Sequence, residues 1–299
     1  MLAPGSRIAV VAPAGGFSPE RLSQGIETVR GWGYSVVLAP HLEAAGPRHR
    51  YLSATREQRQ ADLAWALTAH DIDAVWFARG GFGTAHLLAD LPWDRVDQRP
   101  ILGFSDATAL FGEACRRRLR AIHAPVLQGL ADYDLLAEPS SVRVDPESRL
   151  VLRHLLATGV SPFLPGEPLC GPKTSVRGRV VGGNLSVIAS TCGTPWALQA
   201  KGCVLALEDT REAPYRIDRL LTQLQAAGTL EGVVGVALGQ FDHCAPEHQP
   251  WTLREVLHDL LAPLGVPVVA GLPFGHTAHN YAFELGREGQ LTAEGLRFT

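Results

Sequence analysis

Apolar and polar positions alternate along the first half of the chain in a pattern that predicts strands and helices in turn. Short apolar runs predict buried strands at residues 7–12, 34–38, 73–78, 101–104 and 121–125. Helical spacing of apolar residues predicts helices over 18–29, 55–69 and 106–118, and a further helix is expected from about residue 85. Such alternation is typical of a parallel sheet with helices on both faces.

Helix starts support this interpretation. Ser18 and Pro19 have the residue types of an N-cap and a first helical position. Thr55 and Gln58 have the spacing of a capping box, in which each residue satisfies a free backbone N–H group of the other. The first two helices therefore have defined N-termini.

The second half mixes strands and helices less regularly. Expected elements are strands at 176–181, 202–207, 233–240 and 266–273, a short helix after 185, helices at 215–227 and 252–261, and a closing hairpin from 280–285 and 289–298. Proline and glycine punctuate residues 161–172, which indicates a connection. We expect an α/β protein: an N-terminal parallel α/β domain (1–135), an interdomain connection (136–172) and a smaller, more open C-terminal mixed α/β domain (173–299).

Composition excludes several classes of protein. Of 299 residues, 46% are hydrophobic and 19% charged, which is ordinary for a globular protein, and the net charge of −3 argues against a nucleic-acid partner. No apolar run has the length of a membrane span, and the N-terminus lacks the pattern of a signal peptide, so we expect a cytoplasmic protein. The five cysteines form no CxxC pair, which favours reduced thiols over a disulfide frame or zinc site.

Three polar residues stand where an apolar strand stops: Ser105, Glu208 and His276. A serine at a strand-to-helix corner can act as a nucleophile beside free backbone N–H groups, if a histidine removes its proton and a carboxylate orients that histidine. Each residue also has a plainer interpretation. Ser105 could cap the following helix, Glu208 could cap a helix or pair with Arg211, and His276 could donate to a backbone carbonyl.

Two other clusters are weaker candidates. The run from Arg79 to Thr84 is glycine-rich, but it lacks both the Lys-Ser/Thr of a P-loop and GxGxxG spacing. The loop Asp242-His243-Cys244 with Glu247 and His248 contains metal-ligand types without tetrahedral spacing, so solvated surface is favoured over a metal site.

Six segments, taken together, resemble the LD-carboxypeptidase family, serine peptidases of the S66 type. They span nearly the whole chain in the family's order: Ile8-Ala9-Val10-Val11-Ala12-Pro13-Ala14-Gly15, Arg79-Gly80-Gly81-Phe82-Gly83, Gly103-Phe104-Ser105-Asp106-Ala107-Thr108, Gly178-Arg179-Val180-Val181-Gly182-Gly183-Asn184-Leu185, Leu207-Glu208-Asp209 and Phe274-Gly275-His276. The resemblance implies that the N-terminal domain is similar to class I glutamine amidotransferases and that the site lies between the domains.

The resemblance also implies roles for individual residues. Ser105 would be the nucleophile, His276 the general base and Glu208 its orienting carboxylate. The oxyanion hole would use the backbone N–H of Asp106 and that of Gly80 or Gly81. No metal or cofactor is implied. A substrate with a free terminal carboxylate needs a cationic clamp, for which Arg79 is the candidate, although an arginine at a strand end can equally brace its loop.

The family's usual substrate is the murein tetrapeptide, a small peptide that loses its terminal D-alanine in peptidoglycan recycling, and its members often form homodimers. A second branch cuts an amide bond of a peptide–nucleotide antibiotic. Two rivals remain open. A general serine esterase is disfavoured by Ala107, which leaves the G-x-S-x-G elbow incomplete. A non-catalytic peptide-binding protein would keep the cleft but would not react with a serine-directed probe.

Overall fold

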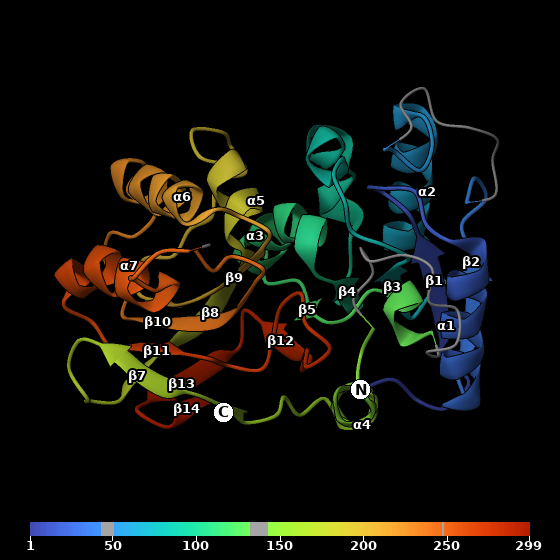
Figure 1. Cartoon of the computed structure of the whole chain (residues 1–299). Helices are drawn as coiled ribbons and strands as arrows, with labels where there is room; N and C mark the ends of the chain where they lie inside the picture. The colour runs from blue at the N-terminus through green and yellow to red at the C-terminus, as the bar shows by residue number, and fades with distance from the viewer. Residues whose placement is uncertain (43–50, 132–142, 247) are drawn as a thin grey trace.

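Two β-sheets with their helices lie side by side in the computed structural model, which describes residues 1–42, 51–131, 143–246 and 248–299 (Figure 1). The first sheet is built almost entirely from the N-terminal half of the chain and the second from the C-terminal half. The expected α/β architecture with two sheets is therefore confirmed.

The first sheet has six strands in the order β12-β5-β4-β3-β1-β2. Five of them pair in parallel: β1 (Arg7–Val11), β2 (Ser35–Leu38), β3 (Ala74–Phe77), β4 (Ile101–Gly103) and β5 (Ala121–His123). Successive side chains of β1 enter different clusters, Ile8 and Val10 on one face and Ala9 and Val11 on the other. Both faces are thus buried, as a parallel sheet requires.

Four helices cover these faces. They are α1 (Pro19–Gly31), α2 (Arg56–Thr68), α3 (Thr108–Arg116) and α4 (Pro146–Thr158). Leucines of α1 and α4 belong to one core cluster, and those of α2 and α3 belong to the other. The predicted caps are confirmed: Ser18 accepts a hydrogen bond from the Arg21 N–H, and Thr55 forms its capping box with Gln58. Among the described residues, no helix combines the length and apolar character needed to cross a membrane.

The prediction of a helix from about residue 85 is wrong. Three short 3-10 turns occupy that stretch instead, at Thr84–His86, Leu88–Asp90 and Trp93–Arg95. Pro92 precedes the third turn and has no N–H group to continue a helical ladder.

The second sheet has eight strands in the order β6-β14-β13-β8-β9-β10-β11-β7. Its strands are β6 (Leu164–Pro165), β7 (Glu167–Cys170), β8 (Val176–Asn184), β9 (Val204–Thr210), β10 (Gly235–Asp242), β11 (Val268–Ala270), β13 (Glu288–Thr292) and β14 (Gly295–Phe298). Its two outermost strands, β6 and β7, are separated only by Gly166, so the sheet curls toward a barrel. The expected mixed character of the second half is confirmed by its parallel and antiparallel pairings, but this half is not more open, because its eight-stranded sheet curls toward a barrel.

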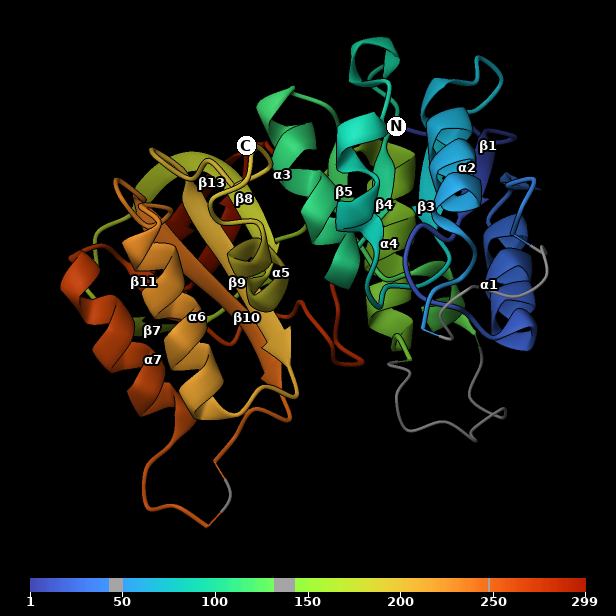
Figure 2. The ribbon, with the colours of Figure 1, turned by 90° about the horizontal axis from the view of Figure 1, so that it is seen from above.

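Three helices accompany the second sheet: α5 (Leu185–Ser190), α6 (Pro214–Ala226) and α7 (Leu253–Leu261). Figure 2 shows them along one face of the sheet. Apolar residues of this sheet, including Leu205 and Leu207 of β9, belong to the same cluster as Phe77 of β3 and Phe111 of α3. One apolar core therefore continues from the first sheet into the second.

The chain returns to the first sheet near its C-terminus. The predicted hairpin of 280–285 with 289–298 is wrong, because β12 (Phe283–Leu285) pairs antiparallel with β5, whereas β13 pairs with β14. Without β12 the edge of β5 would expose unpaired backbone groups, which proteins usually cover. Arg120 and Glu284 form a salt bridge of 3.1 Å beside this pairing. The segment carrying His276 is thereby connected to a strand of the first sheet.

Candidate active site

Ser105 stands at a sharp corner between β4 and α3. Its φ of +61° is a left-handed conformation that non-glycine residues rarely adopt. The 3-10 turn Ser105–Ala107 and the helix α3 that follows it have no side-chain cap, so the capping interpretation of Ser105 is wrong. A strained serine at a strand-to-helix turn is the arrangement that exposes the nucleophile in hydrolases.

The glycine-rich loop after β3 lies directly against this corner. A Cβ atom on Gly80 would lie 2.8 Å from Ser105 Cβ, 2.9 Å from its Oγ and 3.7 Å from the backbone nitrogen of Asp106. Gly81 has a φ of +112°, and a Cβ there would lie 3.1 Å from the Cα of Gly15. Only glycine allows this approach. The segment predicted to supply oxyanion donors therefore lies beside the predicted nucleophile.

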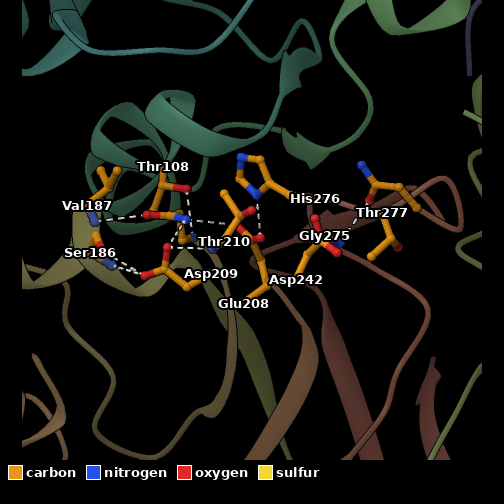
Figure 3. A network of polar contacts seen from close by, with 12 residues as sticks. Thr108, Ser186, Val187, Glu208, Asp209, Thr210, Asp242, Gly275, His276 and Thr277 are labelled. Atoms are coloured by element: carbon orange, nitrogen blue, oxygen red, sulfur yellow. Dashed lines mark hydrogen bonds and ion pairs between the residues drawn. The ribbon is translucent and has the colours of Figure 1, made fainter. Parts of the chain in front are cut away.

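Glu208 and His276 form a close pair on the other side of the site (Figure 3). His276 Nδ1 lies 2.7 Å from Glu208 Oε2, and the Glu208 side chain is fully buried. Glu208 does not cap α6, because the N-cap of that helix is Ala213. His276 contacts the carboxylate of Glu208, whereas the plainer interpretation expected a backbone carbonyl as its partner. A carboxylate on Nδ1 leaves Nε2 as the nitrogen that can accept a proton.

The electrostatics of this pair favour a basic imidazole. Burial by itself lowers the pKa of His276, but the negative charge of Glu208, its hydrogen bond and the charges of Asp209 and Asp242 together raise the pKa above its ordinary value. An imidazole held in this way accepts a proton more readily than a free one, which suits a general base.

Asn184, to which the sequence patterns assign no role, binds the carboxylates of Glu208 and Asp209. Its Nδ2 donates to Glu208 Oε1 at 3.2 Å and to Asp209 Oδ1 at 3.1 Å, while its Oδ1 accepts from the Val187 N–H. Its backbone N–H donates to Thr108 Oγ1 of α3 at 3.0 Å. The available signal was an asparagine directly before an apolar helix, a common N-cap pattern.

A second residue that the sequence argument missed is His123, at the end of β5. It is fully buried against Phe104, Phe274 and Phe283, and neither ring nitrogen has a hydrogen-bond partner among the described residues. Burial, together with nearby His276, lowers the pKa of His123 to about 3, so the ring is neutral. It acts as an aromatic packing group behind the site.

The two halves of the site approach each other through Phe104, which precedes Ser105. Its ring centroid lies 4.6 Å from that of His276. Ser105 and His276 are both described, and the structure contains no hydrogen bond between them. In ligand-free hydrolases such bonds often form only when substrate is bound. The fold thus brings Ser105 near the pair of Glu208 and His276, although the three residues lie far apart in the sequence.

Arg79, the candidate substrate clamp, follows β3 and is partly buried. Its Nη1 donates a hydrogen bond to the carbonyl oxygen of Gly16. This hydrogen bond braces the loop and uses one of the five N–H donors of the guanidinium. Its role toward a substrate stays a prediction.

The segment around Asp242 was the alternative metal site. Within the described residues, no group of three or more His, Cys, Asp or Glu side chains is arranged to hold a metal ion. His243 Nε2 lies 3.6 Å from Asp242 Oδ2, and Glu247 is outside the described residues.

Comparison with known proteins identifies two family domains in this chain. Residues 8–124 match the LD-carboxypeptidase N-terminal domain and residues 177–291 match the C-terminal domain. The murein tetrapeptide carboxypeptidase of Pseudomonas aeruginosa is 36% identical, covering 98% of this chain and 95% of its own. The microcin C7 self-immunity protein MccF of Escherichia coli is 25% identical, covering 92% and 86%.

A solved structure supports the same relationship. The muramoyltetrapeptide carboxypeptidase from Oxalobacter formigenes superposes with a TM-score of 0.82 at 26% identity, over 97% of each chain. Sequence and architecture therefore agree over both sheets.

Proposed function

We propose that this chain, which belongs to the LD-carboxypeptidase family, is a serine carboxypeptidase that removes the terminal D-alanine from the murein tetrapeptide. The observation that carries the proposal is the pair of Glu208 and His276, 2.7 Å apart, supplied by the second sheet to the strained corner at Ser105. The names of the relatives in Pseudomonas aeruginosa and Oxalobacter formigenes support this choice of substrate.

The proposed reaction has two steps. Ser105 Oγ attacks the carbonyl carbon of the scissile L–D amide while His276 Nε2 takes its proton, and Glu208 stabilises the resulting imidazolium through Nδ1–H. His276 then gives the proton to the leaving nitrogen of D-alanine, and an acyl-enzyme on Ser105 remains. A water molecule, deprotonated by His276, releases the shortened peptide and restores the serine.

The negative oxygen of each tetrahedral intermediate needs hydrogen-bond donors. The proposed donors are the backbone N–H of Asp106 and that of Gly80 or Gly81. The close packing of Gly80 against Ser105 and the Asp106 backbone supports this assignment. Such donors contribute about 10²-fold to 10³-fold each to turnover.

Arg79 is proposed to bind the terminal carboxylate of the substrate. Arg79→Ala should raise KM more than it lowers kcat, because a ground-state ionic contact is lost. Arg79→Lys keeps the charge and is the matched control. If both variants lower kcat equally with KM unchanged, Arg79 only braces the loop through Gly16.

A second candidate substrate is the amide bond of a peptide–nucleotide antibiotic. The match to the microcin C7 self-immunity protein favours keeping this candidate, although that relative is less similar than the Pseudomonas aeruginosa protein. Both substrates use the same nucleophile, base and oxyanion donors.

The deciding experiment is mass spectrometry of L-Ala–D-Glu–diaminopimelate–D-Ala after incubation with the wild type and with Ser105→Ala. We expect the wild type to release one alanine and the variant none. If neither releases alanine, the murein assignment is wrong and the peptide–nucleotide amide is tested next. A cytoplasmic location and a homodimer stay predictions, to be checked by cell fractionation and by light scattering.

A further inference from the structure

The glycine loop beside Ser105 is held from the nucleophile side by a buried carboxylate. Asp106 is 2% exposed, and its Oδ2 accepts a hydrogen bond of 2.8 Å from the backbone N–H of Thr84. Asp106 directly follows Ser105, while Thr84 ends the run that begins at Gly80. One side chain therefore ties the corner that carries the nucleophile to the loop that faces it.

A buried guanidinium holds the same loop at a second point. Arg59 of α2 is 2% exposed, and its Nη1 donates to the carbonyl oxygens of Gly83 at 3.0 Å and Pro13 at 2.5 Å. Its Nε donates to the carbonyl oxygen of Ala54 at 3.3 Å. Arg59 thus joins three loop segments at the carboxyl end of the first sheet.

The loop has little freedom between these two anchors. A Cβ on Gly83, whose φ is +135°, would lie 2.7 Å from Arg59 Nη1. The Gly15 N–H also donates to the carbonyl oxygen of Gly80 at 3.0 Å. Hydrogen bonds therefore hold this loop at Gly80, Gly83 and Thr84.

The two anchors are both buried and have side chains of opposite charge. Burial raises the pKa of Asp106, in opposition to its hydrogen bonds with Thr84, and lowers the pKa of Arg59, in opposition to the charge of Asp106. The charge of Asp106 acts on Arg59, and both side chains are held away from water.

We propose that the side chains of Asp106 and Arg59 are positioning residues for the reaction, which hold the Gly80–Thr84 loop so that its backbone donors meet the oxyanion. This inference rests on the proposed serine mechanism. Neither side chain is required to touch the substrate. Their action is on the geometry of the oxyanion hole, where a misplacement of about 1 Å costs about 10²-fold in rate.

The test uses Asp106→Ala, which removes the acceptor for the Thr84 N–H, and Asp106→Asn, which keeps an acceptor oxygen. We expect Asp106→Ala to lower kcat about 10²-fold with KM changed less than about twofold, because an oxyanion forms only after binding. Asp106→Asn should recover most of this loss. Arg59→Ala should resemble Asp106→Ala in kcat.

A matched control comes from the same part of the fold. Asp62 on α2 is also buried, and its carboxylate accepts the His41 N–H at 3.2 and 3.3 Å, away from Ser105. Asp62→Ala should lower the melting temperature as Asp106→Ala does while leaving kcat near that of the wild type. Equal losses of kcat in both alanine variants would overturn the proposal, since a general loss of packing would then explain them.

Phosphonylation separates this inference from the proposed function. A fluorophosphonate forms a P–O bond to Ser105 Oγ with loss of fluoride and of the serine proton, and its phosphoryl oxygen occupies the oxyanion hole. We expect the wild type, Asp106→Asn and Asp62→Ala to react quickly and Asp106→Ala about 10²-fold more slowly. An unreactive wild type would overturn the serine mechanism and the inference with it. A reactive wild type matched by Asp106→Ala would overturn the inference alone.

Discussion

The two halves of the site are built by different means. The nucleophile corner depends on backbone geometry: Ser105 has a φ of +61°, and Gly80 approaches so closely that a Cβ would lie 2.9 Å from Ser105 Oγ. The acid–base half depends on side-chain bonding, in which Asn184 and His276 satisfy the buried carboxylate of Glu208. One half stores strain, and the other satisfies buried charge.

Because of this difference, substitutions in the two halves of the site should differ in how they affect reaction rate and stability. Backbone strain at a functional corner has little to do with holding the fold together, so altering it should affect rate more than stability. A buried carboxylate that loses its partners costs free energy of unfolding as well as activity.

Removing the proposed nucleophile, Ser105, should have the largest effect on turnover. Ser105→Ala should lower kcat by about 10⁴-fold or more, because no other group can form the acyl-enzyme. Its melting temperature should stay close to that of the wild type, since Ser105 caps no helix. Ser18→Ala is the matched control, expected to lose about 1 kcal/mol of stability and no activity, because Ser18 caps α1. The reverse pattern would remove the contrast.

Neutralising the orienting carboxylate should be next. Glu208→Gln should lower kcat by about 10²-fold to 10⁴-fold, because the imidazolium loses its counter-charge. The pKa of His276 falls in this variant, so the acid limb of the kcat/KM profile should move to lower pH. A limb that stays at the wild-type pH would show that His276 is not the titrating base.

The same variant makes a stability prediction with a defined sign. Glu208 raises the folded-state pKa of His276, so their contact stabilises the fold fully below the ordinary histidine pKa of about 6.5, and this stabilisation is lost as pH rises through the folded value. The deficit of Glu208→Gln in free energy of unfolding should therefore be larger near about pH 5 than near about pH 9. Denaturant titrations at both pH values measure it.

Adding one methyl group to the glycine loop should have an intermediate effect. Gly80→Ala should lower kcat by about 10-fold to 10²-fold, because its Cβ displaces Ser105 or the loop. Gly16→Ala is the control, since a Cβ there has no atom nearer than 4.0 Å. Steady-state kinetics of the two variants compare a glycine packed against Ser105 with a glycine that has space for a Cβ. Equal rates would mean that the loop adapts without cost.

The smallest effect is expected at the base of the His276 loop. Asp145 caps α4 through the Ser148 N–H and lies 2.5 Å from His279 Nδ1. Although burial opposes it, hydrogen bonds from Ser148 and His279 lower the pKa of Asp145. Asp145→Ala should cost about 1 kcal/mol at neutral pH, and a few-fold in kcat through a looser His276 loop.

The pH dependence of that cost has the opposite sign to that at His276. A depressed carboxyl pKa stabilises the fold above the unfolded value of about 3.9, and the benefit disappears as pH falls through the folded value. Thermal melts of Asp145→Ala and the wild type should converge in acid. Melts that stay equally far apart at all pH values would exclude the ionic part of this contact.

Local patterns were sufficient to predict much of the fold. Capping residues such as Ser18 and Thr55, and apolar runs ended by a polar residue, depend on neighbours a few positions away, so the sequence states them directly. The helix expected from residue 85 failed where Pro92 interrupts the periodicity. The strand ends at Ser105 and Glu208 indicated the site because ligands bind where parallel strands end.

The sequence alone was enough to give the succession of strands along the chain, the helix caps and the family, and it led to the side chains proposed to carry the chemistry. The tertiary structure was needed to show that β12 pairs with β5 and that β6 and β7 are the two edges of the curled second sheet. It was also needed to show that Asn184 links two carboxylates to α3. These pairings join residues far apart in the chain. They depend on which surfaces bury apolar area and satisfy polar groups together, and no local pattern records that.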